Sequence, residues 1–296
     1  MDKRIIGHRI LHFPLTKILA GVIICAGIPA GLTIGAQSLF KALLLNNEIA
    51  DFIGGITVAS AVIVCYRILY KFYEKRKITE FSVNKLARNL ILGIALGAIL
   101  QFLTILVIYL DKGFTVISYN SFVVLFPSML IAITTAVFEE TIFRGIIFRI
   151  MEEKLGSYIA LFISALLFGA LHLLNPNSSL LTAFGLAVQA GLLLGAAYIY
   201  SNNLWLPIAI HFAWNFTQSG VFGAITSGNS MGKSLLNSRI QGPALITGGT
   251  FGPEGSIQAT LFCLIAAIIL IIVSYRQNKI IKPFWRISKE KLPAQV

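Results

Sequence analysis

Two glutamates and an arginine follow a long apolar run, where they could carry out acid–base chemistry away from water. The run VVLFPSMLIAITTAVF leads directly into Glu139 and Glu140, and Arg144 follows four positions after Glu140. Residues four apart share one face of a helix, so Glu140 and Arg144 are expected to form an ion pair. Glu139 is rotated by about 100° from Glu140 and is free to point elsewhere. The alternative interpretation is that the two glutamates mark the end of a helix at a membrane interface.

Two histidines and an asparagine lie in later apolar segments. His172 follows Phe168 by four positions, and His211 and Asn215 are four positions apart within NLWLPIAIHFAWNF. Polar groups in apolar helices are costly, so these side chains are expected to meet one another or a shared water cavity. The alternative is that they only form hydrogen bonds that hold the helices together.

The segments that carry Glu139 and His172 are expected to form an antiparallel hairpin. Its turn is centred near Leu155–Gly156, about sixteen residues after Glu139 and about sixteen before His172. A hairpin with this turn places the two side chains at the same depth. The equal depth favours an enzyme over a membrane protein without chemistry of its own.

This set of side chains fits the hydrolysis of a peptide bond. A carboxylate in apolar surroundings can act as a general base, and a neighbouring imidazole can help it hold a water. A second imidazole and a carboxamide can stabilise an oxyanion. Neither Ser nor Cys is placed beside these residues, so attack by water is expected rather than a covalent intermediate.

A metal-bound water is an open alternative. His172, His211 and Glu139 form a ligand set that a catalytic divalent metal such as zinc accepts. Glu140 would then have to be the base, although Arg144 already partners it. The residues alone leave open whether the water is free or bound to a metal.

The elements that must position these residues are membrane helices. Of the 296 residues, 56% are hydrophobic and 12% are charged. About a quarter of the residues in a soluble domain are charged, so most of this chain must be solvated by lipid or by its own helices. The expected fold class is all-α, a polytopic membrane protein with about eight transmembrane helices. These segments are 16–36, 50–70, 89–110, 121–150, 157–174, 179–200, 203–218 and 257–274.

The charges predict the orientation in the membrane. The formal net charge is +12, but the basic residues lie between apolar runs, which favours membrane lipid as a partner and argues against nucleic acid. Of the 24 Lys and Arg residues, all but Lys41, Lys112, Lys233 and Arg239 fall in segments on one side of the eight-helix arrangement. The prediction is a plasma-membrane protein with both termini cytoplasmic. The first apolar stretch is expected to be an uncleaved span.

The expected organisation is a single membrane domain, 1–296. It comprises N-terminal helices over 1–120, a catalytic core over 121–218 and a long outer loop over 219–256. The loop is rich in Gly and Ser and is expected at the surface, although loops of this length are also often lids or re-entrant segments. The three cysteines are expected to be small core residues without disulfides; these are Cys25, Cys65 and Cys263.

Three motifs together resemble the CPBP family, which groups CAAX proteases, among them the CAAX prenyl endopeptidase, with bacteriocin-processing (Abi) enzymes. The motifs are Glu139-Glu140-x-x-x-Arg144, Phe168-x-x-x-His172 and His211-x-x-x-Asn215. They occur in the family's order within residues 121–218. The stretch LITGGTFGPEGS is also similar to an outer-loop signature of bacterial members.

The resemblance implies an eight-helix intramembrane endopeptidase, often labelled a metalloprotease, that acts on a peptide or protein. By this resemblance Glu139 looks like the water-activating base, assisted by His172. His211 and Asn215 look like the pair on the oxyanion side. Glu140 and Arg144 look like a structural ion pair.

The family suggests bacteriocin or pheromone precursors, or self-immunity, as the biological setting. Two alternatives from other classes remain. One is a non-catalytic immunity or scaffold protein that keeps the motifs for packing. The other is a small proton-coupled transporter that uses the glutamates as a relay, although the chain lacks the internal repeat that is typical of transporters.

Overall fold

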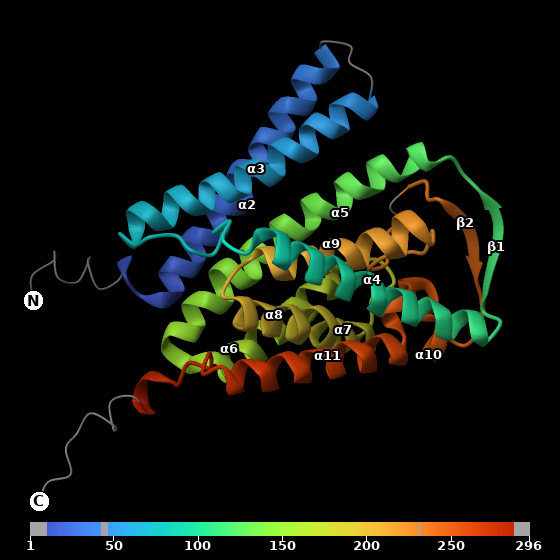
Figure 1. Cartoon of the computed structure of the whole chain (residues 1–296). Helices are drawn as coiled ribbons and strands as arrows, with labels where there is room; N and C mark the ends of the chain where they lie inside the picture. Colours follow the sequence, from blue (N-terminus) through green and yellow to red (C-terminus); the bar gives the residue numbers. More distant parts are fainter. Residues whose placement is uncertain (1–10, 43–46, 231, 287–296) are drawn as a thin grey trace, which may run out of the picture.

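The computed structural model describes residues 11–42, 47–230 and 232–286, and most of these residues are helical (Figure 1). The α-helices are α2 Pro14–Ala42, α3 Asn47–Tyr73, α4 Leu86–Leu110, α5 Leu125–Glu140, α6 Arg149–Leu171, α7 Leu180–Leu186, α8 Leu193–Ser201, α9 Trp205–Asn215, α10 Ala244–Thr247 and α11 Ile257–Arg276. The predicted all-α fold class is confirmed. One feature was not expected, a two-stranded antiparallel sheet of β1 Phe114–Tyr119 and β2 Leu236–Ile240.

Six helical stretches in the described part of the chain are long and apolar enough to cross a membrane. They are Pro14–Ala36, Ile53–Tyr73, Leu86–Leu110, Phe122–Leu174, Leu180–Ser201 and Ile257–Arg276. The predicted count of eight is therefore not confirmed. Phe122–Leu174 joins the fourth and fifth predicted segments. Helix α9 has 11 residues and the π-helical turn after it six, which is short of the ~20 residues that a span usually needs.

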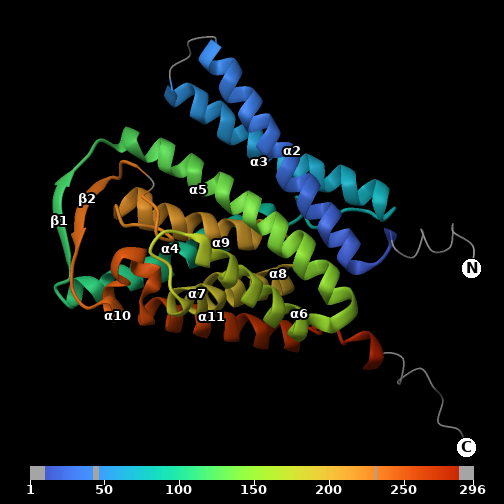
Figure 2. The ribbon, with the colours of Figure 1, turned by 180° about the vertical axis from the view of Figure 1, so that it is seen from behind.

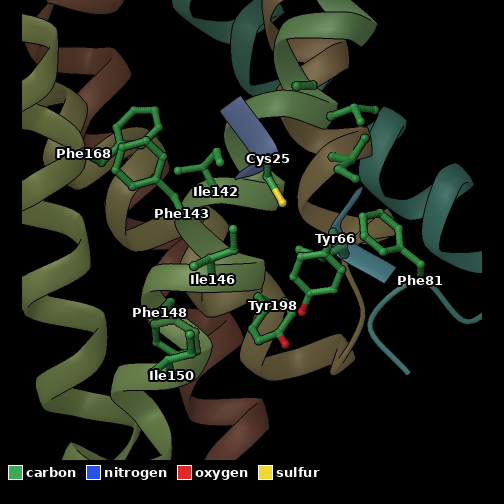
Figure 3. Packing of buried hydrophobic residues seen from close by; sticks show 14 of the residues in the cluster. Cys25, Tyr66, Phe81, Ile142, Phe143, Ile146, Phe148, Ile150, Phe168 and Tyr198 are labelled. Carbon is green, nitrogen blue, oxygen red and sulfur yellow. The ribbon is translucent and has the colours of Figure 1, made fainter. Parts of the chain in front are cut away.

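The stretch Phe122–Leu174 folds back on itself at Gly156, which confirms the turn predicted near Leu155–Gly156. Gly156 has φ 76° and ψ 166°, outside the helical region. A side chain there would be strained, since a Cβ would also lie 2.7 Å from the backbone nitrogen of Pro283. The rings of Phe143 and Phe168 meet edge to face across the hairpin, 4.7 Å between centroids (Figure 3).

This ring contact fixes the register of the hairpin. Positions 143 and 168 lie symmetrically about the same turn as positions 139 and 172. A register that joins Phe143 to Phe168 therefore brings Glu139 and His172 to matching heights, one turn further from Gly156. The segment after α11 holds the turn itself, because Ser157 donates its backbone N–H to Ile281 O (3.0 Å) and accepts from Ile281 N at its hydroxyl (2.9 Å).

Small residues let the helices that carry the site approach closely. On α4, a Cβ at Gly93 would lie 2.5 Å from Cβ of Ala209, and one at Gly97 would lie 2.3 Å from the carbonyl oxygen of Ile210. Close backbone approach through a G-x-x-x-G pair is a common way of packing membrane helices. The two glycines therefore hold α9, and with it His211, against α4.

The hairpin is packed in the same way against the helices that follow it. A Cβ at Gly169 on α6 would lie 2.3 Å from the carbonyl oxygen of Ala183, and one at Gly191 would lie 2.7 Å from Cα of Ala165. The aromatic and aliphatic core around this hairpin includes Phe143, Phe148, Phe168 and Tyr198, all buried (Figure 3).

A buried ionic network lies at the end of the molecule where the hairpin turns. Its members are Lys17, Glu74, Arg76, Glu80, Arg149 and Glu153. Glu74 accepts from Lys17 (3.0 Å) at one carboxylate oxygen, and the other lies 2.7 Å from Arg76 and 2.9 Å from Arg149. Burial raises the pKa of Glu74, but the charge of Arg149 and the bonds from Arg76 and Lys17 outweigh burial and hold it below its ordinary value.

The ends of α2 and α11 that lead to the chain termini are on the same side of the molecule, opposite the β1–β2 sheet (Figures 1 and 2). The termini themselves, 1–10 and 287–296, lie outside the described residues, so their cytoplasmic location stays a prediction. All three cysteines are free, and Cys25 and Cys263 are buried, as predicted.

Candidate active site

Glu140 joins two of the predicted site residues. Its Oε1 accepts from Arg144 Nη1 at 2.8 Å and from His211 Nδ1 at 2.9 Å, and its side chain is fully buried. Glu140 and Arg144 thus pair as expected for positions four apart. The carboxylate also holds the imidazole, so Glu140 fixes the orientation of His211 as well as carrying an ion pair.

Glu139 lies on the other side of the same imidazole. Its Oε2 is 3.9 Å from His211 Nε2, too far for a direct hydrogen bond. This oxygen is buried and has no hydrogen-bond partner among the described residues, and the same holds for Oε2 of Glu140. Buried polar atoms nearly always have partners, and an exception often marks a reactive group.

Arg144 is held by contacts that the sequence did not indicate. Its Nη2 donates to the carbonyl oxygens of Ala190 (2.5 Å) and Gly191 (3.2 Å), and its guanidinium stacks over the ring of Phe168 at 4.9 Å. Arg144 is almost fully buried. A buried guanidinium with this many partners locks the hairpin against the segment that follows α7.

Three π-helical turns adjoin the site. They span Thr141–Phe148, Ala187–Leu192 and Phe216–Val221. The first begins directly after Glu140, and the third directly after Asn215. The second supplies the carbonyls that bind Arg144. Such turns are rare and are often found at functional sites.

His172 lies at the end of α6, where its ring packs on Phe168 with 4.5 Å between centroids. Its Nδ1 is 2.9 Å from the carbonyl oxygen of Phe168. A carbonyl can only accept, so Nδ1 carries a hydrogen and donates it. Nε2 is then the ring nitrogen of His172 that is free to exchange a proton.

A small cavity, about 40 Å³, lies between α6, α9, α11 and the loop before α11. Its polar lining residues are His172, Gln189, His211, Asn215, Ser227 and Glu254. His172, His211 and Asn215 therefore share one cavity. Glu139 does not line it and instead contacts His211 from the other side. The volume suits one or a few water molecules but not a peptide.

Glu254 was not among the predicted site residues. It lies in the 219–256 loop, yet its side chain is only 2% exposed. One signal could have found it, because it is the only acidic residue between Glu153 and Glu290. Burial raises the pKa of Glu254, and the hydrogen bond from Ser227 and the charge of His172 act in the opposite direction.

The residues do not fit the metal site that the sequence allowed. In the described part of the chain, no three His, Cys, Asp or Glu side chains gather closely enough to hold a metal ion. Glu139 lies outside the cavity that His172 and His211 share. The Nδ1 atoms of both histidines are already bound, to a backbone carbonyl and to Glu140.

A comparison with known families matches the segment that carries the three motifs. Residues 120–217 match the family model described as Type II CAAX prenyl endopeptidase Rce1-like. No curated protein and no solved structure matches the chain. The matched segment contains all three motifs, from Glu139 to Asn215, whereas Glu254 lies beyond it. Residues 120–217 are thus similar to the CAAX-type proteases of the CPBP family, in agreement with the resemblance of the three motifs.

Proposed function

We propose that this protein is an intramembrane endopeptidase that hydrolyses a peptide bond by general-base attack of water. The observation that carries the proposal is the buried, unpartnered Oε2 of Glu139 beside an imidazole that Glu140 holds in place. Oε2 of Glu140 is unpartnered among the described residues as well, but Oε1 of Glu140 is already bound to Arg144 and His211, so Glu140 holds the imidazole and Glu139 is left to act as the base. An oxygen without a partner can accept a proton from a water.

Glu139 is the proposed base. Its Oε2 takes a proton from a water molecule as the water oxygen attacks the carbonyl carbon of the scissile bond. A carboxylate oxygen within hydrogen-bond reach of a water can act as its general base. The attack produces a tetrahedral intermediate with a negative charge on the former carbonyl oxygen.

His211 and Asn215 are the proposed partners of that oxyanion. As an imidazolium, His211 keeps Nδ1 on Glu140 and donates from Nε2, while the carboxamide of Asn215 donates from the same cavity wall. Donors fixed in advance by the fold stabilise the charge without reorganisation during the reaction. Arg144 keeps Glu140 in position and so supports the imidazole indirectly.

His172 is the proposed donor to the leaving amine. When the carbon–nitrogen bond of the intermediate breaks, the amine nitrogen takes a proton from Nε2 of His172. The proton that Glu139 took from water then returns to His172 through the site. The number of protons balances, because the one water that is consumed is added across the peptide bond and each side chain returns to its starting protonation state.

We infer that the substrate is a peptide or protein segment that reaches the site from the extracytoplasmic side. Support comes from charge, because the end of the molecule with the hairpin turn carries the ionic network and most basic residues. The opposite end, with the β1–β2 sheet, carries Lys112, Lys233 and Arg239. The more basic end of a membrane protein faces the cytoplasm. Exported bacteriocin or pheromone precursors at the plasma membrane fit this arrangement.

Substrate binding requires the cavity to widen. The 219–256 loop supplies Ser227 and Glu254 to its wall, and the sheet links that loop to the segment before α5. We propose that this loop moves to admit the peptide and then closes over it. The catalytic core over 121–218 would remain in place.

The test uses the purified full chain in phosphatidylcholine proteoliposomes with two fluorescence-quenched probes. One is a library of unmodified peptides, and the other is a peptide ending in a farnesylated CAAX sequence. Glu139→Gln should abolish cleavage while keeping the fold. The matched control is Glu153→Gln, because Glu153 is a half-exposed glutamate of the same hairpin.

Two results would overturn the proposal. One is cleavage by Glu139→Gln at the wild-type rate. The other is full activity of Glu139→Gln in a cell-based immunity assay, which would indicate a non-catalytic immunity or scaffold protein. A transporter would instead lose pH-dependent flux in the same proteoliposomes.

A further inference from the structure

The cavity contains a second carboxylate, that of Glu254, in addition to the residues of the three motifs. It belongs to a loop outside the matched family segment, and its side chain is buried. The mechanism proposed above does not use it. Burying a carboxylate costs free energy, so we expect a function that explains why Glu254 is buried beside the reacting groups.

The loop is built to hold Glu254 in this place. Gln189 donates from Nε2 to the backbone carbonyl oxygen of Glu254 at 2.7 Å. Gly252, two residues earlier, has φ 108°, and a Cβ there would lie 2.1 Å from the carbonyl oxygen of Ile225. The chain can make this turn only with glycine, because both the backbone angle and the space exclude a side chain.

The same loop is tied to the segment that follows His172. Ser227 donates from its hydroxyl to Oε1 of Glu254 at 2.5 Å. The backbone carbonyl oxygen of Ser227 accepts from the side chain of Asn175, three residues after His172, at 3.1 Å. Ser227 therefore connects the carboxylate to the end of the helix that bears the imidazole.

The orientation of His172 gives this connection a chemical meaning. Nδ1 is committed to the carbonyl oxygen of Phe168, so Nε2 must both take up and release the proton. His172 and Glu254 line the same cavity and interact through their charges. A carboxylate facing an imidazole attracts the positive charge that the ring carries when it holds its second proton.

We propose that Glu254 is a positioning residue whose carboxylate orients His172, so that Nε2 of His172 can give a proton to the leaving amine. This role rests on the endopeptidase function proposed above. The proton passes from Nε2 of His172 to the amine nitrogen, and Glu254 itself gains and loses none. Glu254 and Glu140 then play parallel parts, each holding one histidine.

A purely structural role would not need the charge. Glutamine at position 254 could still accept from Ser227 through its side-chain oxygen. Glu254→Gln can therefore keep the hydrogen bond from Ser227 while it removes the negative charge. The matched control is Glu152→Gln, because Glu152 is another buried glutamate that accepts from a serine hydroxyl, that of Ser157 at 2.5 Å, but at the opposite end of the hairpin.

The experiment measures kcat and KM of the full chain with the quenched peptide that the wild type cleaves best. Glu254→Gln should lower kcat by about 10- to 100-fold, by analogy with the outer partners that orient metal-bound histidines, and change KM by less than about twofold. Glu152→Gln should leave kcat unchanged. Glu254→Asp, which keeps the charge on a shorter side chain, should recover part of the loss.

A second measurement separates action through His172 from a general effect. In a His172→Ala background, adding Glu254→Gln should lower kcat no further, because the residue through which it acts is absent. Independent, multiplying losses would overturn the proposal, as would wild-type kcat in Glu254→Gln. A wild type no more active than Glu139→Gln would instead refute the endopeptidase function itself, and with it this role of Glu254.

Discussion

Two clusters of buried charge lie at different levels of the same hairpin, and they differ in how their carboxylates are paired. In the network near the turn, both oxygens of Glu74 and both of Glu80 have partners. In the site, Glu139 and Glu140 each keep one buried oxygen without a partner among the described residues. Burying ions costs free energy in both clusters, but only the site leaves buried carboxylate oxygens without a hydrogen-bond donor in the described part of the chain.

Under the mechanism proposed above, this difference separates a structural role from a reactive one. The network joins the first helices to the hairpin, with Arg149 bound to Glu74 and packed over the ring of Tyr70 at 4.7 Å. Pairing of this kind stabilises one arrangement of helices. In the site, the unpaired oxygen of Glu139 can exchange a proton. Substitutions in the two clusters should therefore affect different properties.

The largest effect is expected from Glu139→Gln, which should reduce peptide cleavage by about 10³-fold. Glutamine has nearly the same shape but cannot take a proton from water. Its thermal unfolding temperature should stay close to that of the wild type, because the lost oxygen had no partner. Fluorescence assays with the quenched peptide and light-scattering melts measure the two properties. A large drop in thermal stability with unchanged cleavage would instead show that Glu139 has a structural role, like the carboxylates near the turn.

The opposite pattern is expected from Arg149→Met. Removing one cation from a buried ion network costs up to about 3–5 kcal/mol. Lys17 and Arg76 remain beside Glu74 and Glu80, but they must then balance both buried carboxylates alone. Cleavage per folded molecule should remain near the wild-type rate. Denaturant unfolding in mixed micelles measures the stability, and active-site counting of the folded fraction corrects the rate. If the melt were unchanged, the network would not hold the helices together.

Glu140→Gln should show a mixture of both patterns. The variant weakens the ion pair with Arg144 and loosens His211, so we expect lower stability and a loss of about 10- to 100-fold in kcat. Glu140→Asp, which retains the charge, serves as the comparison variant. A loss of stability alone would restrict Glu140 to the structural pair that the motif suggested.

The smallest effect concerns acid stability. The pKa of Glu74 is lower in the folded protein than its ordinary value, so its stabilising contribution is complete above the ordinary Glu range. That contribution is lost as the pH falls through the folded pKa. Melting temperatures should therefore fall between about pH 6 and about pH 3, and Glu74→Gln should flatten this slope. An equal slope in both proteins would show that other groups control acid stability.

The sequence was informative where a local rule applied. Charges after an apolar run predicted the pair of Glu140 with Arg144, and segment lengths predicted the turn at Gly156. The long-range features could not be predicted. The bond from Glu140 to His211 depends on how α9 packs against α4. The burial of Glu254 depends on a loop path that only the assembled helices define.

The predicted number of eight spans is not confirmed. Hydropathy counts apolar residues but does not define where a helix begins and ends. Hydropathy also overestimates the length of regular α-helix at α9, where eleven residues of α-helix pass into a π-helical turn. The β1–β2 pairing joins segments far apart in sequence, and neither strand carries a local signal strong enough to predict its partner.

The π-helical turns have a further consequence, for insertions and deletions. Such a turn contains one residue more than an α-helical turn, so it resets the angular phase of everything beyond it. Deleting a single residue from Thr141–Phe148 would restore the ordinary phase and rotate Glu139 and Glu140 by about 100° relative to the helix after them. The side chains of an unchanged sequence motif would then contact different neighbours. The orientation of the proposed catalytic side chains thus depends on the number of residues in the turn as much as on their types.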